Sequence, residues 1–60
     1  METLKRLKEL MEKLSIDSTK VFEKRNKSAS IRARRYAQQI REIMPLFRKE
    51  ILNEIKKNGN

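Results

Sequence analysis

Six basic side chains lie within fourteen residues of this 60-residue chain, in the stretch EKRNKSASIRARRY (residues 23–36). Only one acid, Glu23, lies among them, so this stretch carries a net charge of +5 out of +8 for the whole chain. Like charges crowded together disfavour folding unless an anion balances them. Arginine stands at three neighbouring positions, and guanidinium groups bind phosphate oxygens in a bidentate manner. The stretch therefore predicts a surface that binds phosphate groups.

Seven residues are predicted to contact phosphate because they are cations of this stretch or lie at an expected helix start. They are Lys24, Arg25, Lys27, Ser28, Arg32, Arg34 and Arg35. A helix that begins here would also offer free N–H groups at Ala29, Ser30 and Ile31, at the positive end of the helix dipole. The alternative is that the cations are solvated and bind no ligand.

Base-specific recognition is not expected, because the chain contains no zinc-finger or basic-zipper pattern and no recognition helix between short helices. Asn26 is interpreted as a turn residue, and Gln38 and Gln39 as solvated residues, although amide side chains can read bases. Tyr36 is interpreted as a core residue whose hydroxyl reaches solvent. The sequence thus predicts contact with the nucleic-acid backbone. RNA remains an alternative to duplex DNA.

Catalytic and metal-binding chemistry finds no support in the sequence. The chain has no histidine and no cysteine, which removes disulfides, thiolate metal sites and the commonest ligand of zinc, copper and nickel. A single glycine rules out a glycine-rich phosphate loop. Neighbouring acids such as Glu9 and Glu12 are interpreted as a solvated helix surface. We expect no enzymatic activity, no cofactor and no bound metal.

Two amphipathic helices are predicted to position the basic stretch. At 100° per residue, seven apolar side chains between residues 4 and 22, Phe22 among them, fall within an arc of ~120°. This pattern predicts a helix over residues 2–25, with a break at residues 15–19 as the alternative because those residues are mediocre helix formers. Asn26 tolerates the left-handed conformation and Ser28 is a good N-cap, so a turn is predicted over residues 26–28.

The second helix is predicted over residues 29–57 and contains Pro45. Nine of its apolar side chains share an arc of ~120°. Pro45 cannot donate a hydrogen bond to the carbonyl of Arg41, yet the apolar pattern continues across it without a shift in phase. A single helix kinked at Pro45 is therefore favoured over two helices.

The predicted fold is all-α: a two-helix antiparallel hairpin that forms one domain over residues 1–60. The second helix is longer by ~10 Å, which leaves Ile51, Leu52 and Ile55 without a cover from their own chain. Both apolar arcs are wider than the seam of a two-stranded coiled coil, and so short a chain has a small core. We therefore expect a homodimer that forms a four-helix bundle. The residues expected in its core or dimer interface are Leu7, Met11, Leu14, Ile40, Met44, Phe47, Ile51 and Ile55.

The charge balance limits the partners of the chain. A net charge of +8 favours a polyanion, which would be nucleic acid, an anionic membrane or an acidic protein. No apolar run approaches the ~20 residues of a membrane span, and the first thirteen residues lack the pattern of a secretory signal. We expect a soluble, cytoplasmic protein with no membrane partner. A helical module that docks on an acidic protein is the main alternative.

The stretch EKRNKSASIRARRYAQQIREI resembles the short bacterial linker-histone-like proteins, the chlamydial type of nucleoid protein. The family pattern runs acidic-basic pair, Gly-Asn-Lys, two small residues, Gly-Thr and Arg-Ala-Arg-Lys. The matching positions here are Glu23-Lys24, Asn26-Lys27, Ser28-Ala29 and Arg32-Ala33-Arg34-Arg35. Arg25 and Ser30 stand where that pattern has glycine. The lysine/alanine-rich tail of the longer members is not part of this sequence, so any DNA binding is expected to come from the hairpin.

The resemblance implies DNA association, chromosome compaction and self-association through helices. Together with the basic stretch, it predicts a non-sequence-specific, histone-like protein of the bacterial nucleoid. Double-stranded DNA and a second copy of the chain are the expected partners.

Overall fold

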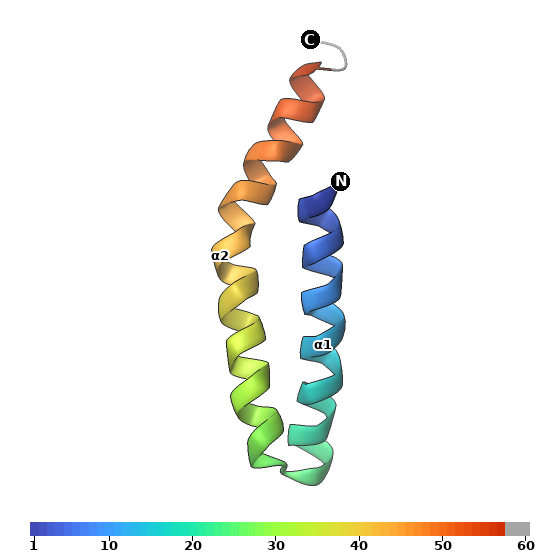
Figure 1. The fold of residues 1–60 in the computed structure, drawn as a ribbon, viewed down its shortest axis with the longest axis vertical. Helices are drawn as coiled ribbons and strands as arrows, with labels where there is room; N and C mark the ends of the chain where they lie inside the picture. Colours follow the sequence, from blue (N-terminus) through green and yellow to red (C-terminus); the bar gives the residue numbers. More distant parts are fainter. Residues whose placement is uncertain (58–60) are drawn as a thin grey trace.

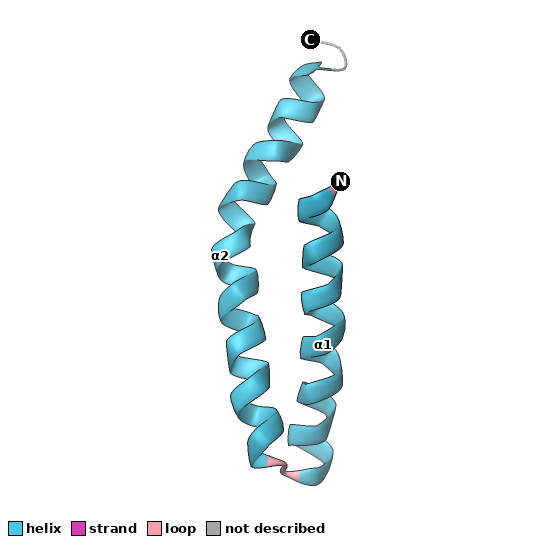
Figure 2. Ribbon diagram, in the orientation of Figure 1, coloured by secondary structure: helices cyan, strands magenta, loops and turns pink. Residues whose placement is uncertain are grey.

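The computed structural model describes residues 1–57 and shows an antiparallel helical hairpin (Figure 1). Within these residues the chain forms two helices, α1 (Glu2–Lys24) and α2 (Lys27–Lys57), joined by a two-residue turn at one end (Figure 2). The molecule is a rod that measures 49 × 15 × 15 Å. The prediction of an all-α hairpin is confirmed.

The two helices meet along a seam whose residues alternate at spacings of four and three, the repeat of a coiled coil. The seam of α1 consists of buried and half-buried residues: Thr3, Leu7, Leu10, Leu14, Asp17 and Val21. The seam of α2 follows the same alternation: Ala29, Ala33, Tyr36, Ile40, Ile43, Phe47 and Glu50. Each helix thus presents a narrow stripe to its neighbour, and the rest of each wide apolar arc lies outside the seam.

The core of the single hairpin is very small. Among residues 1–57, the buried apolar residues are Leu7, Leu10 and Ala29, and the fully enclosed Ala29 brings the helices close together beside the turn. So little buried apolar surface contributes only modest stability to a chain of this length.

The predicted core set divides into two groups in the single hairpin. Leu7 is buried, and three members of the set are half-buried: Leu14, Ile40 and Phe47. The other four are exposed: Met11, Met44, Ile51 and Ile55. Their burial in a dimer interface remains a prediction. Phe22, which the helical wheel placed on the apolar arc, is 85% exposed and has no core position in the hairpin.

The turn is shorter than predicted, and its residues have different roles. Arg25, rather than Asn26, takes the left-handed conformation, with φ 51° and ψ 40°, and its N–H donates to the carbonyl of Val21 at 2.9 Å. Asn26 caps α2 in place of Ser28, because its side-chain Oδ1 accepts a hydrogen bond from the N–H of Ala29 at 3.0 Å. As a result, α2 begins at Lys27, two residues before the predicted start.

Replacing Arg25 with glycine is expected to stabilise the hairpin. A residue with a Cβ atom disfavours the left-handed conformation by about 1 kcal/mol, a cost that glycine avoids. The pattern of the linker-histone-like proteins, which this chain resembles, has glycine at this position. In urea denaturation followed by circular dichroism, Arg25→Gly should raise the free energy of unfolding by up to about 1 kcal/mol. A lower stability than that of the unmodified chain would contradict this account of the turn.

Both helices are continuous. The alternative break at residues 15–19 does not occur, and α2 runs through Pro45 as predicted. Figure 1 shows that the last part of α2 leans toward the side on which α1 begins. A proline inside a helix removes a backbone hydrogen bond and is a common cause of such bending.

The second helix extends past the first, as its length predicted. The Thr3 hydroxyl donates to Glu50 Oε1 at 2.7 Å, so the first turn of α1 lies level with Glu50. Beyond this level Ile51, Leu52 and Ile55 are 41%, 59% and 58% exposed. The end of α2 is therefore left without a helix to pack against in the single hairpin.

Candidate nucleic-acid interface

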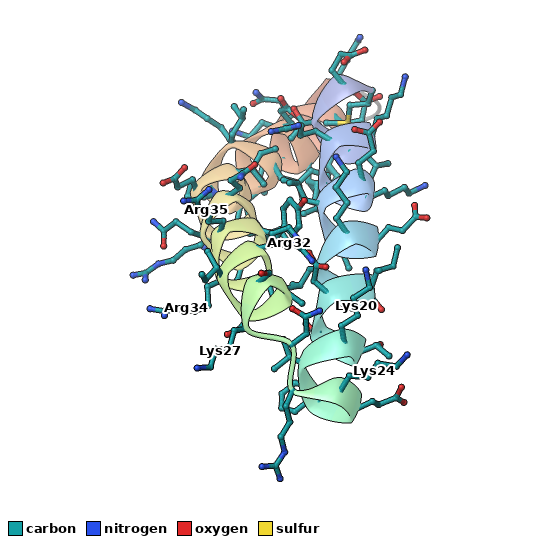
Figure 3. All side chains as sticks on the ribbon, turned by 60° about the horizontal axis from the view of Figure 1, so that its bottom comes forward. Lys20, Lys24, Lys27, Arg32, Arg34 and Arg35 are labelled. Atoms are coloured by element: carbon teal, nitrogen blue, oxygen red, sulfur yellow. The ribbon has the colours of Figure 1, made fainter. Side chains whose placement is uncertain are left out.

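The folded hairpin gathers the basic stretch around its turn. Figure 3 shows Lys24 on the α1 side of this end, and Lys27, Arg34 and Arg35 on the α2 side. Arg25 occupies the turn itself. All five residues are exposed. We call the set Lys24, Arg25, Lys27, Arg34 and Arg35 the basic tip.

None of the five cations of the basic tip forms an ion pair within residues 1–57, and the first turn of α2 contains no acid. Unpaired cations on one end of a narrow rod create a positive potential that attracts anions. Because they lie on both sides of the turn, they can approach more than one row of phosphates.

Arg32 differs from the other cations of the stretch. Its Nε donates to Asp17 Oδ2 at 3.1 Å, and its Nη2 donates to Asp17 Oδ1 at 3.2 Å. The Asp17 side chain is 8% exposed and the Arg32 side chain 44% exposed. This bidentate pair spans the two helices and neutralises a carboxylate that would otherwise be buried in the seam. The structure thus gives Arg32 a partner within the hairpin that the sequence did not predict.

The start of α2 does not offer the free N–H groups that were predicted. The N–H of Ala29 donates to the Asn26 side chain, and the N–H of Ser30 donates to the Asn26 carbonyl at 3.1 Å. Because the helix begins at Lys27, the N–H of Ile31 falls within the regular helical pattern of hydrogen bonds. This part of the prediction is wrong, so the case for phosphate binding depends on side chains.

The outer surface of α2 continues the interface beyond the turn. Arg34 and Arg35 line a shallow hollow together with Ile31 and Gln38. The Gln38 amide donates to Glu42 Oε1 at 3.2 Å, so the first acid on this side of α2 lies about two turns beyond the two arginines. On this surface of α2, Arg34 and Arg35 therefore have no carboxylate within ion-pair distance among the described residues.

A comparison with protein families extends over nearly the whole chain. The family model described as histone H1-like protein Hc1 matches residues 1–58. The chain belongs to the Hc1 family. This result confirms the resemblance to the chlamydial-type proteins, and it identifies a histone-like, DNA-binding protein. No curated protein and no solved structure matches the chain significantly.

One cation beside the basic tip of this Hc1-family protein was not among the predicted contact residues. Lys20 lies on α1 near the turn (Figure 3) and lines a shallow hollow with Lys13, Asp17, Arg32 and Tyr36. Lys13 and Lys20 are seven residues apart, a spacing that places two side chains on the same side of a coiled-coil helix. This seven-residue spacing is the feature of the sequence that could have identified Lys20. Tyr36 is half-buried beside them, in agreement with its interpretation as a core residue.

The second glutamine is also engaged within the hairpin of this Hc1-family protein. Gln39 accepts a hydrogen bond from Arg6 Nη2 at 3.1 Å, which links α2 to the first half of α1. Gln39 is half-buried rather than fully solvated, so its amide serves the contact between the helices. Among the described residues, neither helix has an apolar segment long enough to cross a membrane.

Proposed function

We propose that this Hc1-family protein binds duplex DNA without sequence preference, through contacts between its basic tip and backbone phosphates. It acts in the bacterial nucleoid, within the cytoplasm, where it compacts or bridges DNA. The observation that carries the proposal is the set of five exposed cations that have no carboxylate partner in residues 1–57. Membership of a histone H1-like family supports DNA as the polyanion that these cations bind.

The shape of the tip favours contact with the backbone. The rod is 15 Å wide in both short directions, which is close to the ~12 Å width of the major groove of B-DNA. Lys24 projects from α1 and Arg35 from α2, so the two side chains can contact phosphates on either side of a groove (Figure 3). Lysine and arginine contacts of this kind set the position of a protein on the duplex and carry little sequence information.

Arg32 contributes to this function as a positioning residue. Its guanidinium neutralises Asp17 in the seam, and the pair fixes α2 against α1 next to the turn. The five unpaired cations then project from a rigid end of the hairpin. Ser28, exposed in the first turn of α2, is able to donate its hydroxyl to the same phosphates.

Compaction requires more than one DNA-binding site. A homodimer carries two basic tips, and it can hold two DNA segments or two sites on one segment. Exposed apolar residues outside the seam, including Met11 and Ile51, provide surface for such an association. If each tip neutralises ~4 phosphates, the logarithm of the affinity of the dimer falls with the logarithm of salt concentration with a slope of about −7.

A gel-shift series with the unmodified chain tests the proposed function. Two duplexes of equal length and unrelated sequence should be retarded at the same protein concentration, because the contacts are to phosphates. A duplex RNA of the same length tests the choice of polymer. No retardation of either DNA at low salt, or strong preference for one sequence or for RNA, would overturn the proposal.

A further inference from the structure

We propose that one long side of the hairpin is the surface on which a second copy packs in the antiparallel direction, with Phe22 of each copy in a groove at the open end of the other. This inference rests on the proposed function for its biological role, since a dimer of this geometry would place one basic tip at each end. The geometric argument uses the hairpin alone.

The proposed surface is apolar and exposed. Its members, which we call the apolar face, are Leu4, Met11, Phe22, Met44, Ile51 and Ile55. Leu4 and Met11 are seven residues apart on α1, as are Met44 and Ile51 on α2, so each pair repeats along one side of its helix. Leu4 is half-buried, and the other members of the apolar face are at least 36% exposed.

Two hollows show that these stripes lie on the same side of the hairpin. At the open end, a groove of about 750 Å³ is lined by residues of both helices, including Leu4, Phe47, Ile51 and Ile55. Near the turn, a second hollow is lined by Phe22 and by small residues of both helices, including Ser18 and Ala37. The first hollow is large enough to take an aromatic ring, and the second leaves Phe22 standing 85% exposed beside it.

The opposite side of the hairpin has a different character. On α1 it carries Arg6, Lys13 and Lys20, again at spacings of seven. These residues border hollows that are also lined by Arg32 and Glu42 of α2. Charged residues are depleted from the centres of protein interfaces, whereas methionine and phenylalanine are enriched there. The apolar face is therefore the side that a second copy would cover.

Phe22 and the groove lie at similar distances from opposite ends of the rod, so two antiparallel copies can bring them together. At ~1.5 Å per residue, Phe22 lies about 5 Å from the turn, and Ile51 and Ile55 lie about 37 and 43 Å from it. Two antiparallel copies whose turns are ~45 Å apart thus bring Phe22 of each copy level with the groove of the other. The midpoint, ~22 Å from each turn, is the level of Met11. A single two-fold axis through this midpoint therefore brings Phe22 of each copy to the groove of the other, as in an isologous interface.

Charge selects the antiparallel arrangement over the parallel one. Two parallel hairpins would place two stretches of net charge +5 side by side, and like charges at this spacing repel. In the antiparallel dimer the two basic tips are ~45 Å apart, several times the Debye length of ~8–10 Å in physiological salt. The single hairpin buries little apolar surface, and packing of the apolar face against a second copy would bury more.

Chemical crosslinking tests the arrangement, because the chain has no cysteine of its own. A Phe22→Cys chain mixed with an Ile55→Cys chain should give a crosslinked heterodimer with a short bis-maleimide reagent, which tolerates distances that a disulfide does not. Each single variant alone should give little product. The matched control is Ile16→Cys mixed with Leu46→Cys, since these exposed residues lie at matching levels of two antiparallel copies but would face each other only if the opposite side formed the dimer.

Strong product from Phe22→Cys alone would overturn the antiparallel direction, and product from the control pair would overturn the choice of side. Absence of product from the Phe22/Ile55 mixture would overturn the inference itself.

A second variant keeps the test independent of crosslinking geometry. Phe22→Ala removes a side chain that makes almost no contact within its own hairpin, so the variant should fold normally. In sedimentation equilibrium it should weaken dimerisation by about 100-fold or more, because each dimer loses two buried phenylalanines at ~1.5–3 kcal/mol each. An unchanged dimer, or a chain that is monomeric at every concentration before substitution, would contradict the inference.

The same samples separate this inference from the proposed function. If Phe22→Ala is monomeric but a monomer still retards DNA, both proposals stand. If the unmodified chain retards DNA but never dimerises, the proposed DNA contact stands and the dimer falls. If the chain dimerises through the apolar face but does not bind DNA, the reverse holds.

Discussion

Replacing Lys27 and Arg35 with alanine should weaken DNA binding by roughly ten- to a hundredfold at ~0.1 M salt. Both residues are exposed members of the basic tip, and neither has a carboxylate partner within residues 1–57. Each lost phosphate contact removes about 1 kcal/mol of favourable interaction, together with the release of a counterion. Sedimentation equilibrium of the double variant separates a loss of phosphate contacts from a change in oligomeric state. Fluorescence anisotropy with a labelled random duplex measures the effect.

The matched control is the pair Lys8→Ala and Arg41→Ala. It removes the same two types of exposed cation, but from the middle of the rod, ~23–26 Å from the turn of the same hairpin and about 20 Å from the turn of an antiparallel partner. Nonspecific attraction by the net charge of the chain would weaken binding equally in both double variants. The proposed interface predicts a loss of no more than about threefold in the control. Equal losses would show that the basic tip has no special role.

Replacing Asp17 with asparagine should lower the free energy of unfolding by about 2 kcal/mol. The Asp17 carboxylate is nearly buried and accepts two hydrogen bonds from Arg32, and a hydrogen bond to a charged group contributes roughly 1.5–3 kcal/mol. The asparagine keeps the volume but replaces one of the two accepting oxygens with an NH2 donor, and it leaves Arg32 without a counter-charge. For a hairpin with so small a core, this is a large part of the total stability.

Glu12→Gln is the control for Asp17→Asn, because it removes an equal charge from an exposed position of the same helix. Urea denaturation of both variants at equal protein concentrations should show a loss for Asp17→Asn alone. Equal stability of the two variants would contradict the structural role of the pair.

The hairpin could be predicted from the sequence because its evidence is local. Periodic apolar residues define both helices, and the phase that continues across Pro45 correctly indicated a single helix. The turn was placed within two residues. The roles of Arg25 and Asn26 were misassigned because residue preference favours asparagine in the left-handed conformation, whereas the fold uses the asparagine side chain to cap α2.

The errors have a common physical cause, which is the relative placement of the two helices. A helical wheel gives the face of a residue but not the residue opposite to it, so the pair between Asp17 and Arg32, fifteen residues apart, was missed. An arc of ~120° also merges the seam with the stripe beside it, which is why the exposed Phe22 fell on the same apolar arc as the buried Leu7 and Leu10. When both helices are divided into coiled-coil heptads, the seam is distinguished from the stripe beside it, and Asp17 falls in the seam.

The candidate interface was predicted in composition but not in detail. Local excess of positive charge is visible in any sequence, and the five residues of the basic tip were all among the predicted contacts. The engagement of Arg32 and the capping of the first N–H groups depend on three-dimensional contacts, as does the presence of Lys20 beside the turn. The structure thus shifts the expected phosphate contacts from backbone N–H groups to side chains.

The most direct test of the central claim is the salt dependence of DNA affinity for the unmodified chain and for the two double variants of Lys27/Arg35 and Lys8/Arg41. The slope of log affinity against log salt counts the phosphates that are neutralised. The account predicts a slope that is shallower by about 2 for each bound tip in the Lys27/Arg35 variant, and an unchanged slope in the Lys8/Arg41 variant. Identical slopes for all three proteins would show that the basic tip does not contact the phosphate backbone.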